Sequence, residues 1–427
     1  MSFLKSNMRF IVVGLLFTLV FKYFTLPLYA EEVHLRYLFW ANTPEEIPIM
    51  QEVIKAFEKR NPNIKVEGFS EVGARHYEKL DTMIAGGVAP DVIDMAVEFM
   101  PFYASRGALL NLQPLIDKDK DFNLKIFAPK LVQAWKYHGD QYGLPVNAQP
   151  LVLYYNKTMF KDAGIDFPTD NWNWNDFLVA AQKLTKREAN GSTIQWATYL
   201  TTWDGHWSPW VYQSGGNILD KTGTRCLLDR PEAKKAISFI NDLINKYKIA
   251  PQPGAMAIGD YDAFLTGAIA MHISGRWAVP TYRTIKAFEW DVVRLLKDRR
   301  RGIPLYALGT TISSQTKYPQ EAYKLAKFVT SKEAQKYFIK GGNMVPALSE
   351  LAMSREFLEG TPPTNNQAFV LSLNDVIVQP GANWNQIFSV ATTPELDLLF
   401  RGKQSVETTL KNIVEKTNRI LKEYPIR

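Results

Sequence analysis

The most distinctive side chains of this sequence are its tryptophans, several of which follow strand-like segments. Trp277 stands in the stretch HISGRWAVPTY, and Trp203, Trp207 and Trp210 crowd the segment TTWDGHWSPWVYQSGG. With 11 Trp, 19 Tyr and 24 Phe, the chain is rich in aromatic residues. An indole ring offers a large, flat, apolar face. Each of these tryptophans either fills the core or presents a flat surface to a ligand, and the pattern alone leaves both open.

Few residue patterns favour catalysis. The sequence contains no G-x-S-x-G elbow and no Walker loop. Its single cysteine excludes a cysteine-based zinc motif, and its histidines have no metal-ligand spacing along the chain. These residues are Cys226, His34, His76, His138, His206 and His272. Glycoside hydrolysis needs two carboxylates that flank a bond, and the residues alone leave open a secreted enzyme that uses Glu98 with Asp204.

The first 30 residues have the composition of a secretory signal. MSFLKSNMRF carries two basic residues, the apolar run FIVVGLLFTLVF follows, and the segment ends on the small residue Ala30. This order is typical of a cleaved signal peptide, and the run is too short for a comfortable membrane span. An uncleaved anchor is the alternative, since Lys22 interrupts the pattern and the large Leu28 precedes the cut point. We expect a soluble protein of a bacterial periplasm.

The charge balance argues against a nucleic-acid partner. The whole chain has 50 Lys and Arg against 43 Asp and Glu, a formal net charge of +7. Residues 1–30 hold three of the basic residues and no acidic one, so the surplus in the rest of the chain is small. The lone Cys226 allows no internal disulfide, and stability must come from burial. We expect a monomer.

Strand and helix patterns alternate along the chain. Runs of β-forming residues predict strands at 33–40, 64–69, 90–97 and 151–157, and helical apolar spacing predicts helices at 47–60 and 74–87. Helices are also expected at 171–185, where Asn173 or Asn175 can act as the cap, at 231–247, at 318–342 with Gly341 as the C-cap, and in the tail from 394 to 424. The β-α-β-α-β order predicts an α/β domain with a largely parallel sheet.

Several motifs, in their order along the chain, resemble a known family. They are FEKRNPNIKVE, AGGVAPDVIDM, FYASRGALLNLQPLI, LPVNAQPLVLYYNKTMF, AFLTGAIAMHISGRWA and RGKQSVETTLKNI. Each motif is weak alone, but their number, order and spacing cover nearly the whole chain after residue 30. Together they are similar to extracellular solute-binding proteins of the maltose-binding-protein-like type, the sugar receptors of ABC importers.

The resemblance implies an α/β, two-lobed periplasmic binding protein of type II, with a central ligand cleft and hinge strands. Lobe one would comprise residues 31–146 plus 304–346, and lobe two residues 147–303 plus 347–427 with the C-terminal helices. The chain would cross between them near Pro145–Gln149, Ile303–Gly309 and Val345–Leu348. The lobes would close around a small carbohydrate like a hinge and present it to the membrane ABC permease.

The resemblance also points to polar ligand-binding residues at strand ends. Asn42, Glu98 and Gln149 match polar positions that face the sugar, and Trp40 either joins them or packs in the core. Carboxylates and amides satisfy sugar hydroxyls in a water-poor cleft, and hydrogen bonds to a charged group are the stronger ones. The structural alternatives are a helix cap for Asn42, a surface position for Glu98 and a hinge hydrogen bond for Gln149.

The aromatic positions are assigned in the same way. Trp277 matches a stacking tryptophan of the family, and Trp384 lies where a second stacking aromatic is common. Asp204 and Trp207 fall near another such position, with the register open by a residue or two. Arg276 stands where relatives have proline, and its guanidinium could bind hydroxyls, a phosphate or a carboxylate.

Two questions stay open. Arg276 allows an alternative ligand class of glycerol 3-phosphate, a glycerophosphodiester or a polyol. The basic strip Arg299–Arg301 is either a solvated loop or a contact with an acidic transporter patch or an anionic ligand. The resemblance implies no chemistry in the cleft, so we expect no catalytic residue, no cofactor and no metal.

Overall fold

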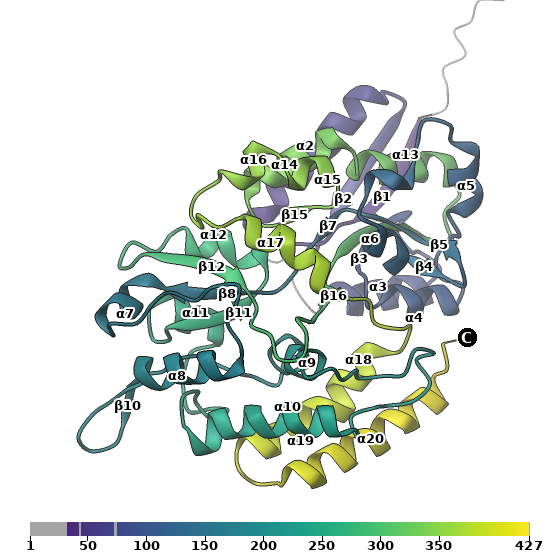
Figure 1. Cartoon of the computed structure of the whole chain (residues 1–427). Coiled ribbons are helices and arrows are strands. Elements are labelled where there is room, and N and C mark those ends of the chain that lie inside the picture. Colours follow the sequence, from purple (N-terminus) through teal and green to yellow (C-terminus); the bar gives the residue numbers. More distant parts are fainter. Residues whose placement is uncertain (1–31, 42–43, 72–74, 427) are drawn as a thin grey trace, which may run out of the picture.

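The computed structural model describes residues 32–41, 44–71 and 75–426 (Figure 1). The predicted signal segment 1–30 and the predicted ligand residue Asn42 lie outside these residues. Among the described helices, none has both the length and the apolar character needed to cross a membrane.

The first lobe is built on a five-stranded sheet with the strand order β2-β1-β3-β14-β6. Its strands are β1 (Val33–Leu38), β2 (Ile64–Phe69), β3 (Val92–Ala96), β6 (Gly143–Pro145) and β14 (Leu308–Ile312). β1 pairs in parallel with β2 and β3, as the sequence predicts, whereas β14 runs antiparallel to both β3 and β6. The antiparallel strand belongs to a segment that returns to this lobe late in the chain.

Helices cover the sheet of lobe one. Its longer helices are α2 (Ile47–Arg60), α3 (Arg75–Ala85), α13 (Pro319–Val329) and α14 (Lys332–Gly341), and its short ones are α4 (Met100–Ser105), α5 (Gln113–Lys118) and α6 (Pro129–Ala134). α2 buries Met50, Val53, Ile54 and Phe57, which share one helix face. The predicted C-cap of α14 is wrong by one residue, because Gly342, with φ 78°, takes the left-handed conformation.

The second lobe has a smaller, antiparallel sheet of β11 (Met271–Ser274), β8 (Val152–Asn156) and β12 (Trp290–Arg294). Helices make up most of the rest of this lobe (Figure 1). They include α8 (Trp174–Leu184), α9 (Asp204–Gln213), α10 (Pro231–Asn241), α11 (Asp260–Leu265), α17 (Gln367–Ser372), α19 (Thr393–Phe400) and α20 (Val406–Glu423). Asn173 caps α8 in a capping box with Asp176. The main sheet of lobe one therefore contains the expected parallel pairing, whereas the three-stranded sheet of lobe two is antiparallel.

The chain crosses between the two sheets three times. The first crossing carries β7 (Asn147–Ala148), the second β13 (Ile303–Pro304) and the third β15 (Val345–Pro346). β7 pairs with β15, and β13 pairs with β16 (Val376–Ile377), so the crossings are tied by strand hydrogen bonds. The predicted lobe boundaries lie in these segments, and the extent of each lobe as a unit stays a prediction.

Short elements complete the described chain. They are η1 (Pro44–Glu46), η2 (Leu124–Ile126), β4 (Lys136–Tyr137), β5 (Asp140–Gln141), α7 (Lys157–Asp162), β9 (Lys186–Arg187), β10 (Thr193–Gln195), η3 (Asp242–Lys246), η4 (Arg276–Ala278), α12 (Val279–Tyr282), α15 (Ser349–Ala352), α16 (Arg355–Leu358), η5 (Leu373–Asp375), α18 (Trp384–Gln386) and η6 (Ile387–Thr392). η4 and α12 follow β11 directly and carry the predicted site residues of that region.

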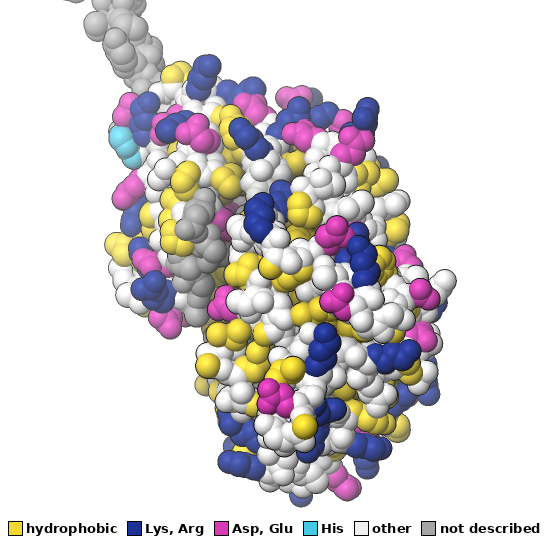
Figure 2. All heavy atoms as spheres, turned by 90° about the vertical axis from the view of Figure 1, so that its left-hand side faces the viewer, with side chains coloured by type: hydrophobic (Ala, Val, Ile, Leu, Met, Phe, Trp, Pro, Cys, Tyr) yellow, Lys and Arg dark blue, Asp and Glu magenta, His cyan; other side chains and the backbone are white. Residues whose placement is uncertain are grey.

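The basic strip Arg299–Arg301 forms hydrogen bonds with the backbone of lobe two. Arg300 Nε donates to the Tyr212 carbonyl at 2.7 Å, and Arg301 Nε donates to the Leu295 carbonyl at 2.7 Å. The side chain of Arg299 is largely exposed, at 66%, and its Nη1 lies 3.4 Å from Glu232 Oε1. On the side of the molecule drawn in Figure 2, basic and acidic side chains are interspersed. All three arginines thus have partners within the chain, and a contact of the strip with the transporter or with an anionic ligand stays a prediction.

Candidate ligand-binding site

Three half-buried aromatic rings meet where the second crossing adjoins lobe two. Trp203 precedes α9, Trp277 lies in η4, and Tyr306 lies between β13 and β14. The Trp203 and Tyr306 rings stack with centroids 5.6 Å apart and planes inclined by 23°. Trp277 stands edge-on to both, with each centroid distance 6.1 Å. We call these three residues the aromatic trio.

Glycines let the two indoles lie against the backbone. A Cβ atom on Gly205 would collide with the ring of Trp203, and one on Gly275 would collide with the ring of Trp277. An indole is rigid and cannot bend aside as a flexible side chain does. The position of each ring therefore depends on a glycine that has no side chain in the way. We call Gly205 the seat of Trp203 and Gly275 the seat of Trp277.

Two carboxylates accompany the trio. Asp204 is 7% exposed and accepts a hydrogen bond from the Tyr306 hydroxyl, and burial raises the pKa of Asp204 to about 6. Glu98 follows β3 in lobe one, and its buried Oε2 atom has no hydrogen-bond partner. Burial raises the pKa of Glu98 to about 8, and the charge of Asp204 adds to this rise. The site thus joins one acidic group from each lobe.

Asp94 supports the lobe-one wall. It is 3% exposed, and its oxygens accept from the Tyr37 hydroxyl at 2.7 Å, the Thr310 hydroxyl at 2.8 Å and the Trp40 amide at 3.3 Å. Burial raises the pKa of Asp94 to about 6. The hydrogen bonds that Asp94 accepts come from groups of its own lobe, so Asp94 stabilises the strand end that carries Trp40. The Trp40 ring packs 5.0 Å from His76.

Gln149 has a hinge role and an unused polar atom. Its Nε2 donates to the Asn343 carbonyl at 3.0 Å, and its backbone amide donates to the Tyr306 carbonyl at 2.8 Å. Its Oε1 is buried without a partner. With Trp40 it lines a cavity of about 30 Å³, enough for a water molecule. Both roles considered for Gln149 are compatible with this arrangement.

Arg276 does not face the cleft. It is 2% exposed, its Nη1 donates to Asn366 Oδ1 at 2.5 Å, and its guanidinium lies 4.3 Å from the ring centre of Phe357. Burial lowers the pKa of Arg276 to about 10. The turn of η4 directs Arg276 into lobe two while its neighbour Trp277 stays half-buried. The prediction that Arg276 contacts the ligand is therefore wrong for this structure.

Two predicted tryptophans are also core residues. Trp207 is 1% exposed inside α9, and Trp384 is 2% exposed, with its ring stacked 5.3 Å from Phe388 and its Nε1 bonded to the Pro380 carbonyl. Trp207 thus has almost no accessible surface, whereas Trp384, although nearly buried, lines two hollows, one of them together with Glu98. Trp203, four residues before Trp207, occupies the position that the sequence assigned to Trp207.

Sequence reasoning also missed Tyr306. The available signal was its place inside the predicted crossing 303–309, where a large aromatic residue lies between both lobes. A larger hollow, of about 760 Å³, lies elsewhere along the lobe junction and is lined by Pro101, Tyr137, Tyr212 and Gln379 among others. It contains no member of the aromatic trio and neither of the two carboxylates. We therefore place the candidate site at the trio.

Comparisons with known proteins agree with this architecture. An ABC substrate-binding protein of Listeria monocytogenes, solved in complex with cycloalternan, superposes with a TM-score of 0.85, is 30% identical, and is matched over 92% of this chain and 100% of that chain. A binding protein of Brucella abortus is 24% identical over 382 residues, 88% of this chain and 90% of that protein. An arabinooligosaccharide-binding protein of Bacillus subtilis is 28% identical over 221 residues, 51% of this chain and 49% of that protein.

The family assignment covers most of the described structure. Residues 40–336 match the family of the bacterial extracellular solute-binding protein. This range includes β3, the first two crossings and the complete aromatic trio. The two-lobed α/β fold of type II predicted from the sequence is confirmed by the structural neighbours. The chain belongs to the bacterial extracellular solute-binding proteins.

Proposed function

We propose that this chain binds a sugar or oligosaccharide between its lobes and delivers it to the permease of an ABC importer. It acts in the periplasm as a monomer, after residues 1–30 are removed, and needs no cofactor. The Listeria monocytogenes neighbour solved with cycloalternan and the Bacillus subtilis arabinooligosaccharide-binding relative support the carbohydrate class.

The observation that carries the proposal is the aromatic trio together with the buried carboxyl group of Asp204 and the half-buried Glu98, one oxygen of which is buried. The C–H faces of a sugar ring are apolar and flat, and they pack on indole rings. Sugar hydroxyls donate hydrogen bonds to carboxyl oxygens, which accept more strongly when the group is ionised. Trp203 and Trp277 would take the ring faces, while Asp204 and the unpartnered Oε2 of Glu98 would take the hydroxyls.

These groups belong to different parts of the chain, so a ligand that contacts them together would favour closure of the lobes. Glu98 belongs to lobe one, Asp204 to lobe two, and Tyr306 to a crossing between them. A ligand that contacts all three stabilises the arrangement in which the lobes are together, and so shifts the population toward it. The permease would then recognise the closed form.

The two alternative functions, binding of a phosphorylated ligand and glycoside hydrolysis, are less well supported. A phosphorylated ligand was suggested by Arg276, whose guanidinium is buried between Asn366 and aromatic rings. A glycoside-active enzyme would use Glu98 and Asp204, but the chain belongs to a family of binding proteins. We propose that the cleft binds without turnover.

A thermal-shift screen of the purified protein tests this function. We expect selected sugars or oligosaccharides to stabilise it, by about 2.7 kcal/mol at 100 times the dissociation constant. Stabilisation by amino acids or peptides alone would contradict the carbohydrate class. Chromatography of each stabilising oligosaccharide after long incubation tests the second part, and any cleavage product would contradict binding without turnover.

A further inference from the structure

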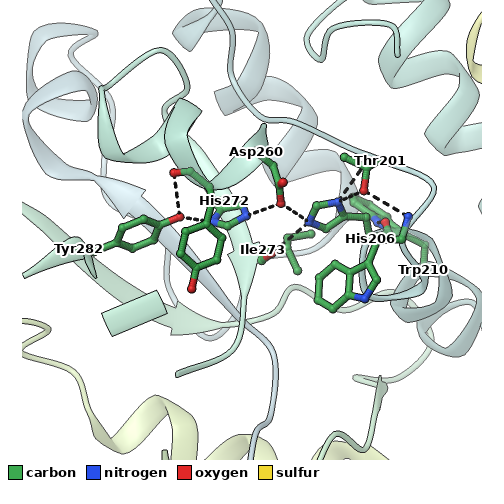
Figure 3. Close-up of polar contacts among 9 residues, drawn as sticks. Thr201, His206, Trp210, Asp260, His272, Ile273 and Tyr282 are labelled. Atoms are coloured by element: carbon green, nitrogen blue, oxygen red, sulfur yellow. Dashed lines mark hydrogen bonds and ion pairs between the residues drawn. The ribbon is translucent and has the colours of Figure 1, made fainter. Parts of the chain in front are cut away.

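A buried polar network lies within lobe two (Figure 3). It consists of His206 on α9, His272 on β11 and Asp260 at the start of α11. His272 Nε2 lies 3.0 Å from Asp260 Oδ2, and His206 Nε2 lies 3.6 Å from the same oxygen. Both histidines are 0% exposed. Its members are separated along the chain, so no local spacing pattern indicates this cluster.

Hydrogen bonds fix the tautomer of His206. The Thr201 backbone N–H donates to His206 Nδ1 at 3.1 Å, so this nitrogen carries a lone pair. Burial lowers the pKa of His206 to about 4, which keeps the ring neutral. Its one proton is therefore on Nε2, which donates to the Ile273 carbonyl at 3.2 Å and points toward Asp260.

The same tautomer argues against a metal site. The nearest ligand atoms of His206, Asp260 and His272 all lie within 4.8 Å of one another, which is the spacing of a metal centre. A metal at His206 Nε2 would require the proton on Nδ1. There it would point at the N–H of Thr201, a donor facing a donor. The arrangement therefore suits a hydrogen-bonded support rather than a ligand set.

His206 connects the segments that carry the two indoles. On one side, Thr201 Oγ1 lies 2.9 Å from His206 Nδ1 and accepts from the Trp203 amide at 3.2 Å. The Trp203 ring also packs edge-on to the His206 ring at 5.0 Å. On the other side, His206 Nε2 holds Ile273, two residues before Gly275, the seat of Trp277.

We propose that His206 is a positioning residue that sets the mutual orientation of Trp203 and Trp277. Its two ring nitrogens hold the loop before α9 to strand β11 at a fixed separation. His272 and Asp260 back this link, and His272 is itself held by the Tyr282 hydroxyl, 2.7 Å from Nδ1. The consequence for sugar affinity rests on the proposed function, whereas the effect on the two indoles does not.

The first test needs no ligand. Fluorine NMR of the fluorotryptophan-labelled protein, with Trp203→Phe and Trp277→Phe to assign the two resonances, reports the surroundings of both rings. His206→Ala should move both resonances, while His34→Ala, at a mostly exposed site, should move neither. Unmoved Trp203 and Trp277 resonances in folded His206→Ala would overturn the proposal, whichever compound the protein binds.

The second test uses rescue and affinity. His206→Gln keeps a donor near the Nε2 position and His206→Asn keeps an acceptor near the Nδ1 position, so each should restore part of the spectrum that His206→Ala loses. With a sugar from the screen, His206→Ala should weaken affinity about tenfold, and its effect should be smaller in a Trp203→Ala background, where only the link to Trp277 remains. Unchanged affinity of folded His206→Ala would contradict the positioning role.

A third measurement separates the metal alternative. Zinc ions should leave the melting temperature of the wild type and of His206→Ala equally unaffected. Stabilisation of the wild type alone by micromolar zinc would overturn the tautomer assigned to His206 and, with it, the proposal. Failure of the sugar screen would remove the proposed function but leave the spectroscopic result standing.

Discussion

The two walls of the candidate cleft contribute different chemistry. Lobe two supplies Trp203 and Trp277, two flat apolar rings with glycine seats beneath them. Lobe one and its first crossing supply Glu98 and Gln149, each with a buried oxygen that has no partner. The rings of the apolar wall are already packed, whereas one oxygen each of Glu98 and Gln149 in the polar wall has no hydrogen-bond partner.

This difference separates two tasks. A ring that is already packed costs little to keep in place, so the lobe-two wall can select the face of a sugar before the lobes meet. A buried oxygen without a partner costs about 1–3 kcal/mol, and a hydroxyl from the ligand would remove this cost. We infer that lobe two selects the ligand and that the polar wall makes closure depend on it.

The largest effect should come from the apolar wall. Trp203→Ala and Trp277→Ala should each cost about 2 kcal/mol of binding free energy, about thirtyfold in Kd, as for central aromatic contacts elsewhere. Titration calorimetry with a sugar from the screen measures this. Trp172→Ala, at a half-buried tryptophan of lobe two packed near Phe160, is the matched control. An equal loss in the control would show that the effect is general destabilisation.

A smaller loss should follow from filling a glycine seat. Gly275→Ala places a methyl group where the Trp277 ring lies, so the ring must move. Affinity should fall about tenfold, with little change in the amount of folded protein. Gly259→Ala, whose added Cβ has open space around it, should bind normally. Normal binding by Gly275→Ala would mean that the position of the Trp277 ring is unimportant.

Some positions of the site could be predicted from the sequence and others could not. The strand ends that carry Glu98 and Trp277 were found because β-strand patterns and the order of motifs place them. The resemblance to the family places a stacking aromatic near Trp207 with the register open by a residue or two, and the tryptophan-rich sequence does not define the helix phase there. Trp203 lies just before α9, whereas Trp207 lies within α9 and is buried, and only the three-dimensional structure distinguishes the two rings.

Arg276 shows a second limit of sequence reasoning. A guanidinium next to a stacking tryptophan has the right chemistry for a polar ligand, but η4 directs neighbouring side chains to opposite sides. Its partners, Asn366 and Phe357, come from 80 or more residues later in the chain. The alternation of β and α patterns predicted the parallel pairing of β1, β2 and β3, whereas no local pattern indicates such a distant contact.

The smallest effect should appear in the pH dependence of protein stability, through Glu98 in the polar wall. Glu98 has a pKa of about 8 in the folded protein, against an ordinary value of 4.5. Between these values the folded state holds a proton that the unfolded state releases, so this group makes the protein less stable as pH rises. Glu98→Gln removes this dependence. The melting temperature of the wild type should therefore fall, relative to that of Glu98→Gln, by about 2 °C or more from pH 5 to pH 8.

Bound sugar should reduce this fall, because hydroxyl donors stabilise the ionised carboxylate and lower the pKa of Glu98. Calorimetry at saturating sugar measures the change, and Glu67→Gln, a mostly exposed glutamate of lobe one, should follow the wild type throughout. Parallel melting curves for wild type and Glu98→Gln would show that the Glu98 oxygen is not held in a dry cleft. The polar wall would then be satisfied by water, and closure would no longer depend on a ligand hydroxyl at this position.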